Sequence, residues 1–174
     1  AMNSGGAHCL KYGVTTNHIL GVKFVTMEGE VVDIGGEAYD LPGYDLLGMI
    51  VGAEGQLGVV TEVTVRLMDK PEAARPSLAG FDSALDAGAC VAAIMATGRT
   101  PVAIEFMDRP AILACENFTG AGYPVEAQAL LIIEVEGSEA EIEEELAFVE
   151  GMARDHGAIS LRVAEDFASA ENIW

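Results

Sequence analysis

The sequence predicts an α+β protein built from a mainly β first part and a ferredoxin-like second part. In residues 1–70, short apolar runs are separated by glycine-containing turns, as in a set of short strands. In residues 71–174, strand and helix patterns alternate. A proline at position 71 ends the long strand of the first part, so we expect the boundary between the two parts at residues 69–72.

In the first part, two apolar runs predict a pair of strands joined by a tight turn. The runs are Val22–Met27 and Val31–Ile34, and Glu28-Gly29 lies between them. Residues 45–50 are a short apolar segment for which we expect a helix.

A further strand is expected from Val59 to Leu67, where side chains alternate strictly. Strict alternation places every second residue on one face. One face is expected to hold Val59, Thr61, Val63, Val65 and Leu67, and the other to hold Val60, Glu62, Thr64 and Arg66. Glycines 52, 55 and 58 precede this strand, whereas a dinucleotide-binding GxGxxG turn follows a strand and opens a helix. The glycines therefore do not predict a Rossmann fold.

The second part shows four strand candidates with helices between them. The strands are expected at residues 75–81, 101–107, 129–136 and 158–163. The clearest helix begins at Ser138, because Glu141 completes a capping box, and its apolar stripe is Ile142, Leu146, Val149 and Met152. This order of elements is typical of a ferredoxin-like fold, with residues 109–118 as an extra helix.

Composition excludes several classes of partner. The formal net charge of -19 repels phosphate, so we expect no contact with nucleic acid or an anionic membrane surface. No apolar stretch approaches the roughly 20 residues of a transmembrane helix. Cys9, Cys90 and Cys115 are odd in number and far apart, which predicts neither a disulfide framework nor a thiolate zinc site. We expect a cytoplasmic protein with no metal site.

Two glycine clusters in the first part are candidates for ligand contact. One is Asn3-Ser4-Gly5-Gly6, followed by His8 and by Lys11-Tyr12-Gly13, and the other is the set at 52, 55 and 58. Glycine lets a backbone adopt positive φ or approach a ligand with no Cβ in the way. Exposed N–H groups in such turns bind phosphate or the edge of a flavin. Taken alone, each cluster is more often only a turn.

The order of these motifs resembles the FAD-linked oxidases and dehydrogenases of 2-hydroxy acids, which are of the vanillyl-alcohol-oxidase type. The segments that carry the resemblance are NSGGAHCLKYG, GVKFVTMEGEVVDIGG, YDLLGMIVGAEGQLGVVTEVTVRL, PVAIEFMD and the later GYP. The branch of the glycolate oxidase D-subunit and D-lactate dehydrogenase is the most similar. The resemblance implies that residues 1–70 are the C-terminal part of a PCMH-type FAD-binding domain. It likewise implies that residues 71–174 begin a ferredoxin-like cap domain.

The resemblance implies FAD as the cofactor and assigns cofactor contacts to two segments. The loop that would pass the flavin and its phosphates contributes Asn3, Gly5, Gly6 and Gly13. The segment that would meet the adenosine half contributes Glu54, Gly55, Gly58 and Val59. The implied reaction oxidises glycolate, D-lactate or a similar 2-hydroxy acid to the 2-oxo acid, with hydride transfer to flavin. The implied partner is an electron acceptor, such as an iron–sulfur subunit.

Two features of the family have no counterpart in this sequence. They are an earlier glycine-rich loop for the FAD pyrophosphate and the later histidine and acidic motifs that serve the substrate. We therefore expect an inactive fragment of a longer enzyme, and no catalytic residue is assigned. Two other functions stay open. One is a non-catalytic module for assembly or ligand binding, and the other is an oxidase of phenols or sugars, against which the match of the cap argues.

The remaining polar side chains are interpreted as structural. Glu105 and Asp108 occupy opposite pleat positions, so they do not form an acid–base pair, and turn or cap roles are expected. His156 precedes a glycine at an expected helix end, where a cation is favourable. Cys9 is expected as a small buried thiol. The acidic run from Glu139 to Glu150 is expected to be the solvated face of a helix.

Overall fold

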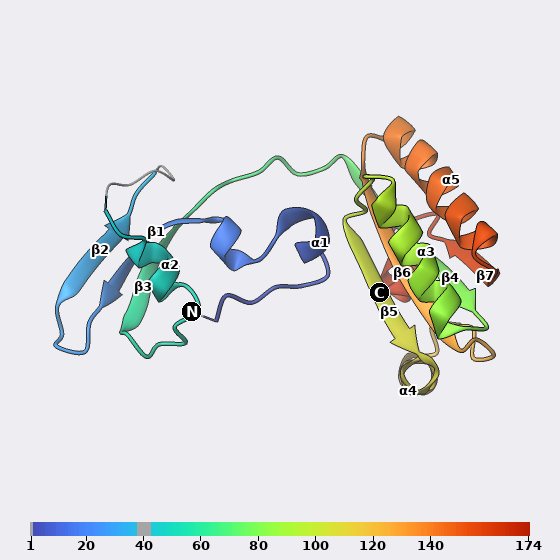
Figure 1. The fold of residues 1–174 in the computed structure, drawn as a ribbon, viewed down its shortest axis with the longest axis horizontal. Coiled ribbons are helices and arrows are strands. Elements are labelled where there is room, and N and C mark those ends of the chain that lie inside the picture. Colours follow the sequence, from blue (N-terminus) through green and yellow to red (C-terminus); the bar gives the residue numbers. More distant parts are fainter. Residues whose placement is uncertain (1, 38–42) are drawn as a thin grey trace. The chain divides into compact units, whose positions relative to one another are not determined.

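The computed structural model describes residues 2–37 and 43–174, which form two compact units (Figure 1). Unit 1 is Ala1–Asp69 and unit 2 is Lys70–Trp174. Both units combine helices with antiparallel sheets, so the predicted α+β class is confirmed. Within the described residues, no helix has the length and apolar character needed to cross a membrane.

Unit 1 contains a three-stranded antiparallel sheet in the order β2-β1-β3. The strands are β1 Ile19–Val25, β2 Val31–Gly35 and β3 Val59–Val65. Three short helical segments accompany them, namely α1 Cys9–Tyr12, η1 Thr15–Asn17 and α2 Leu46–Ile50. The tight turn falls where the sequence predicts it, because Thr26 N–H donates to the Glu30 carbonyl and Gly29 has φ +85°.

The core of unit 1 is small and lies between the sheet and α2. Its buried members are Val22, Phe24 and Ile50. The helix expected at residues 45–50 is present as α2, and Asp45 caps it, because the Asp45 carboxylate accepts the Gly48 N–H at 2.8 Å.

The strict alternation predicted for the strand after the glycines is wrong. Lys23 pairs with Glu62, but the next residue, Phe24, pairs with Val60, so β3 contains a bulge at Thr61. Because residues paired across strands share a face, the bulge puts Val60 and Val63 on one face. The Thr61 hydroxyl at this bulge donates to the Lys23 carbonyl at 3.2 Å.

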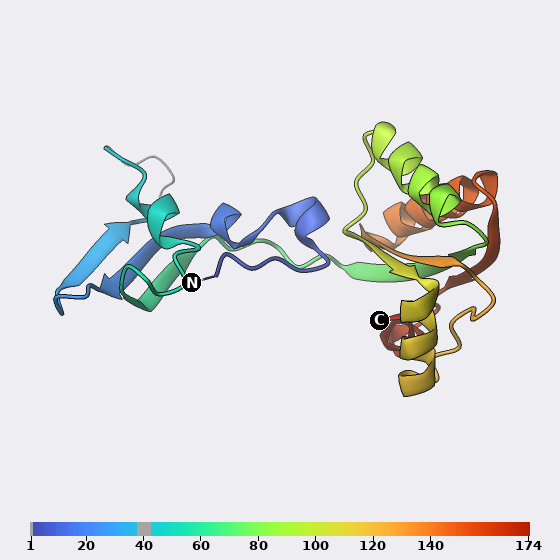
Figure 2. The ribbon, with the colours of Figure 1, turned by 60° about the horizontal axis from the view of Figure 1, so that its bottom comes forward.

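Unit 2 is a four-stranded antiparallel sheet in the order β5-β6-β4-β7. The strands are β4 Ala73–Phe81, β5 Ala103–Asp108, β6 Ala129–Gly137 and β7 Ala158–Val163. The helices are α3 Ala84–Ala96, α4 Arg109–Thr119, α5 Glu139–Asp155 and α6 Phe167–Ile173. Helices α3 and α5 cover one face of the sheet, and α4 and α6 lie on the other (Figure 2). This is the predicted ferredoxin-like order, with α4 as the extra helix and α6 as a helix that the sequence did not reveal.

Strand β6 is the central element of unit 2 because both of its faces are buried. Leu131, Ile133 and Val135 pack with α3 and α5, whereas Leu130 and Ile132 pack with α4 and α6. A continuous apolar run is the pattern expected of such a strand.

Local sequence signals fix the ends of the helices in unit 2. Ser138 and Glu141 form the predicted capping box of α5, and Asp108 caps α4 by accepting the Ala111 N–H at 3.0 Å. His156 follows α5, and its Nδ1 lies 2.8 Å from the Met152 carbonyl. In the predicted apolar stripe of α5, Met152 is only half-buried, and the smaller Ala153 is buried instead.

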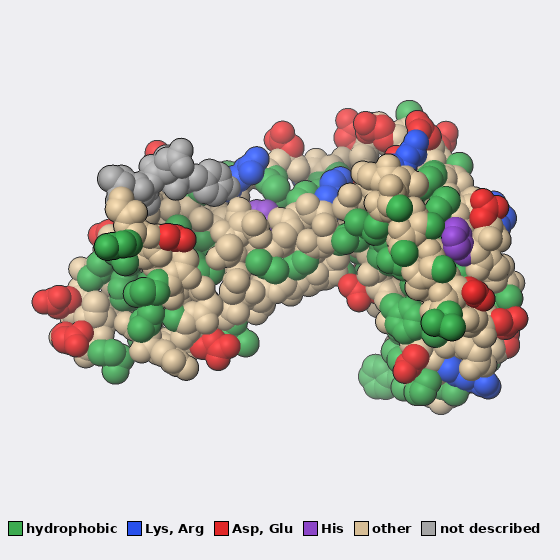
Figure 3. Space-filling view, in the orientation of Figure 1, with side chains coloured by type: hydrophobic (Ala, Val, Ile, Leu, Met, Phe, Trp, Pro, Cys, Tyr) green, Lys and Arg blue, Asp and Glu red, His purple; other side chains and the backbone are tan. Residues whose placement is uncertain are grey.

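Acidic side chains gather on the first turns of α5 (Figure 3). Those that are exposed are Glu139, Glu141, Glu143 and Glu144. The acidic run is therefore the solvated face of an amphipathic helix, as predicted.

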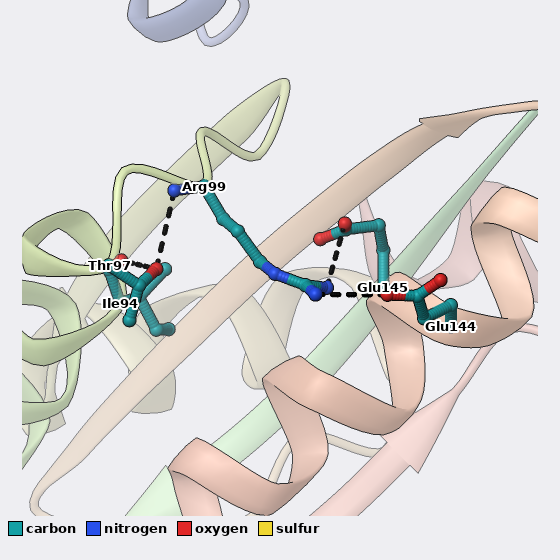
Figure 4. A network of polar contacts seen from close by, with 5 residues as sticks. All are labelled: Ile94, Thr97, Arg99, Glu144 and Glu145. Carbon is teal, nitrogen blue, oxygen red and sulfur yellow. Dashed lines mark hydrogen bonds and ion pairs between the residues drawn. The ribbon is translucent and has the colours of Figure 1, made fainter.

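Arg99 links the segment after α3 to α5 (Figure 4). Its two terminal nitrogens donate to Glu144 and Glu145, each at 2.9 Å, and its guanidinium lies 4.6 Å from the centre of the Phe148 ring. The hydrogen bond to Glu144 is the main reason that the pKa of Arg99 is raised. A planar guanidinium suits this combination of two carboxylates and a ring, which a lysine cannot reproduce.

We expect Arg99→Met to lower the melting temperature of unit 2 more than Arg154→Met does. Arg154 makes one exposed ion pair with Glu150 along the same helix, and such pairs contribute little to stability. Thermal denaturation followed by circular dichroism measures both variants. Equal melting temperatures for the two would show that the Arg99 contacts do not hold α5 in place.

Candidate functional site

The N-terminal loop, α1 and η1 surround an open pocket of about 220 Å³. The loop contributes Gly5 and Gly6, and Gly13 follows α1. The residues that line the pocket also include His8, Cys9, Tyr12 and His18. Three of the glycines predicted to contact a cofactor are thus brought together.

The loop before α1 is held by hydrogen bonds within the unit. Asn3 adopts φ +51°, which asparagine tolerates better than most residues, and its side-chain oxygen accepts the Thr16 N–H at 2.8 Å. The Ser4 carbonyl accepts the Thr15 hydroxyl at 2.6 Å. The Asn3 oxygen therefore fixes the loop to η1, which is a structural role.

At Gly5 and Gly13, neighbouring atoms of the same unit leave no room for a side chain. A Cβ on Gly5 would lie 2.5 Å from Cys9 Sγ, and that sulfur accepts the Gly6 N–H at 2.9 Å. Gly13 has φ +80°, and a Cβ there would lie 2.5 Å from the Asn17 side-chain oxygen. By contrast, a Cβ on Gly6 would meet no atom within 4 Å. Among the pocket glycines, Gly6 is the one whose missing side chain is not explained by the fold.

The second glycine segment lies beside the first. A Cβ added to Gly52 would lie 3.4 Å from the Asn3 Cβ. Within the described residues, only Asn3 and Glu54 are non-glycine residues with positive φ, and each belongs to one of the two segments. Backbone conformations of this kind concentrate at functional sites.

Gly55 and Gly58 differ in what surrounds them. Gly55 has φ +83° and is exposed, and the nearest atom to an added Cβ would be the Gly58 carbonyl oxygen at 3.9 Å. Gly58 is buried, and a Cβ there would lie 2.3 Å from the Val25 carbonyl oxygen. Gly58 is therefore needed to pack β3 against β1. Val59 pairs with Val25 in the sheet and has 66% of its surface exposed.

His18, which lines the pocket, contacts the backbone. Its Nε2 lies 2.9 Å from the Tyr12 carbonyl oxygen. His8 is exposed at the rim of the pocket. Cys9 is half-buried, and its sulfur accepts a hydrogen bond from the Gly6 N–H.

A smaller pocket of about 160 Å³ lies over the sheet of unit 1. Its charged residues are Lys23, Asp33 and Glu62. The Lys23 ammonium is 3.1 Å from Glu62 and 3.9 Å from Asp33, and the hydrogen bond to Glu62 is the main cause of its raised pKa. Because two carboxylates neutralise this lysine, the pocket is a poor site for an anion.

Nothing in the described part of the chain has the donor set of a metal centre. Across residues 2–37 and 43–174, no three side chains of His, Cys, Asp and Glu lie close enough to hold an ion.

Comparison with known proteins identifies the family. Residues 70–174 match the family model described as FAD linked oxidases, C-terminal domain. The chain belongs to this family. The FAD-linked oxidases take their name from the cofactor, which agrees with FAD as predicted.

Curated relatives extend the similarity to unit 1. The chain is 45% identical over 174 residues to the glycolate oxidase subunit GlcD of Escherichia coli K12, covering 100% of this chain and 35% of that protein. It is 37% identical over 164 residues to GlcD of Bacillus subtilis, covering 94% of this chain and 35% of that protein. It is 29% identical over 178 residues to a probable mitochondrial D-lactate dehydrogenase of Danio rerio, covering 100% of this chain and 35% of that protein. The chain therefore spans about a third of the length of these relatives.

Two solved structures share the fold of this chain. An alkyldihydroxyacetonephosphate synthase matches with a TM-score of 0.76 and 21% identity, covering 98% of this chain and 34% of that one. A BBE-like 1 protein of Physcomitrella patens matches with a TM-score of 0.59 and 19% identity, covering 91% of this chain and 30% of that chain. These likenesses confirm the predicted fold class.

The cofactor contacts that the resemblance assigns leave out two residues that the structure brings to this region. Gly52 has φ +97° and lies against Asn3, and Tyr12 lines the pocket. The signal for Gly52 was its place in the 52, 55, 58 series. Tyr12 lies between Lys11 and Gly13 in a motif already noted.

We expect Gly58→Ala and Gly6→Ala to affect stability very differently. At Gly58 the new methyl group would overlap a backbone carbonyl, so the free energy of unfolding of unit 1 should fall by about 1–3 kcal/mol. At Gly6 the space is open, so the change should stay within about 0.5 kcal/mol. Urea denaturation of both variants measures these values, and a comparable loss in Gly6→Ala would contradict the distinction between the two glycines.

Proposed function

We propose that the chain is a segment of a longer FAD-dependent oxidoreductase that oxidises a 2-hydroxy acid, such as glycolate or D-lactate, to the 2-oxo acid. Unit 1 belongs to its FAD-binding domain and unit 2 to its cap domain. The names of the relatives support the substrate class, and the coverage of 35% of their length supports assigning the activity to the longer protein. The chain alone is expected to have no turnover.

The observation that carries this proposal is the meeting of the two glycine segments in unit 1. Asn3 and Gly52 bring the segments together, and each segment holds one glycine, Gly6 or Gly55, whose open side is not used by the fold. A pocket of about 220 Å³ is too small for a whole FAD, but it suits one edge of a flat ligand. We propose Gly6, Glu54, Gly55 and the exposed Val59 as the cofactor contacts. Asn3, Gly5, Gly13 and Gly58 hold the surrounding backbone.

The residues of this chain would bind and orient the cofactor. Bound FAD would supply the acceptor for the hydride on Cα of the 2-hydroxy acid, and a base would take the hydroxyl proton, so that the products would be the 2-oxo acid and reduced flavin. No residue of this chain is assigned as that base. The hydrogen of a backbone N–H group carries a positive partial charge. The N–H groups next to glycine therefore favour contact with electron-rich atoms of a cofactor.

Two further parts of the proposal concern partner and location. The Escherichia coli relative is named as a subunit, which supports the existence of a partner subunit. We propose that this partner accepts the electrons, for example as an iron–sulfur protein. Cys9, Cys90 and Cys115 are all free thiols, which supports a cytoplasmic location.

Gly6→Ala in the complete protein tests the cofactor contact. A methyl group at an open position costs the fold nothing but would separate the backbone from a bound flavin, so we expect FAD to bind at least about tenfold more weakly. Gly36→Ala is the matched control, because an added Cβ at Gly36 also meets no atom within 4 Å. Flavin absorbance per protein and a titration with FAD measure both variants.

Three results are possible in that experiment. Weaker binding in Gly6→Ala alone supports the assignment. A flavin content that is unchanged in both variants refutes contact at Gly6 but does not contradict the proposed enzyme class. An unsubstituted complete protein that binds no flavin contradicts the enzyme itself and favours a non-catalytic module.

A further inference from the structure

Helix α4 carries apolar side chains on the face that points away from the sheet. On its inner face Ile112 is buried in the core and Cys115 packs against it. Its outer face, which we call the α4 stripe, has the spacing of one helical face and consists of the exposed residues Pro110, Leu113, Ala114, Asn117 and Phe118. Phe118 has 92% of its surface exposed. Four of these five residues are apolar, and an apolar patch of this kind marks a contact surface.

Arg109, at the start of α4, is a free cation beside the stripe. In unit 2, Arg75, Arg99 and Arg154 pair with glutamates, and Arg162 donates to a backbone carbonyl. Within the described residues, the exposed Arg109 guanidinium has no hydrogen bond or ion pair. The dipole of a helix favours acidic side chains in the first turn, where α4 has this arginine and no acid. The position of Arg109 is therefore not explained by its own helix.

The stripe is free of negative charge although the chain as a whole is acidic. The formal net charge of the chain is -19. The acid within α4 is Glu116, and its carboxylate is turned to the inner side, where it accepts the Tyr123 N–H at 2.8 Å. A second copy of the chain can therefore approach this face without bringing carboxylates together, as the centre of an interface requires.

We propose that the α4 stripe is the contact between two copies of this chain, with the two α4 helices antiparallel. Most homo-oligomers are two-fold dimers, in which one patch must complement itself. The charges of α4 meet this condition, because a cation lies at its first residue and the last carbonyl groups of a helix carry partial negative charge. Arg109 of each copy would lie at the C-terminal end of the other α4.

The sizes of the side chains also suit an antiparallel pair. Ala114 lies at the middle of the stripe, one turn after Pro110 and one turn before Phe118. A two-fold axis at Ala114 would place Phe118 of each copy against Pro110 of the other, and the small alanine would let the helices approach closely. The contact lies in unit 2 and uses no flavin, so it does not rest on the proposed function.

Phe118→Glu tests the contact by sedimentation velocity of the chain at concentrations up to about 1 mM. One helix of 11 residues offers a small interface, so we expect a weak dimer. About 0.15 M ionic strength screens the repulsion between two acidic chains. The substitution should raise the dissociation constant at least about tenfold, because it puts a carboxylate against apolar side chains twice in a two-fold dimer.

Leu85→Glu is the matched control. Leu85 is on α3, across the sheet from α4, and has 85% of its surface exposed. The same kind of charge is thus added outside the stripe, and the dissociation constant should change by less than about twofold. Because both side chains are exposed, both variants should keep the melting temperature of the unsubstituted chain.

Arg109 tests the antiparallel direction. Arg109→Gln removes its attraction to the end of the other helix, and Arg109→Glu replaces that attraction with repulsion, so dimerisation should weaken in this order. Arg154, exposed on α5, is the control for total charge. Arg154→Gln and Arg154→Glu should differ less from each other than the two Arg109 variants do.

Three results would overturn the proposal. One is a chain that stays monomeric up to about 1 mM. Another is equal weakening of the dimer by Phe118→Glu and Leu85→Glu. The third is a complete protein that is monomeric, which would show that another part of the polypeptide covers the stripe. A dimer of the complete protein that Phe118→Glu dissociates, and Leu85→Glu does not, would support it.

Discussion

The close contact of backbone with backbone in unit 1 is the constraint on which its site depends. Gly35 lies with its Cα hydrogens against the Leu20 carbonyl, and Gly58 lies in the same way against the Val25 carbonyl. Any Cβ at these positions would overlap a carbonyl group, so the three-stranded sheet requires glycine there. This packing fixes the end of the second glycine segment, because Gly58 directly precedes β3. Some glycines of this unit, such as Gly35 and Gly58, therefore build the sheet, whereas Gly6 leaves a surface open.

Unit 2 depends on a different constraint, the need to cover both faces of β6. Helices α3 and α5 bury one face, and α4 and α6 bury the other. Each layer also fixes one arginine. Arg99 is saturated by two carboxylates and a ring, whereas Arg162 keeps two donors free. The contacts of the first arginine are explained by the fold alone.

Local signals in the sequence were sufficient for most elements, and non-local contacts account for what was missed. The capping residues Ser138 and Asp108 predict the starts of α5 and α4 because their hydrogen bonds reach only three residues along the chain. The bulge at Thr61 arises from pairing with β1, so alternation within the strand did not reveal it. Likewise, the sequence placed Gly6 and Gly58 in equivalent roles. Only the neighbours supplied by the fold show that Gly58 is structural and that Gly6 is open.

The most direct test of the account is amide hydrogen exchange of the complete protein with and without FAD. The account predicts that FAD slows exchange in residues 4–7 and 53–57, the two segments that meet near Asn3 and Gly52. Exchange in α3 and α5, which lie in the other unit, should serve as the reference and change little. Slower exchange confined to unit 2, with none in these two segments, would contradict the placement of the cofactor against unit 1.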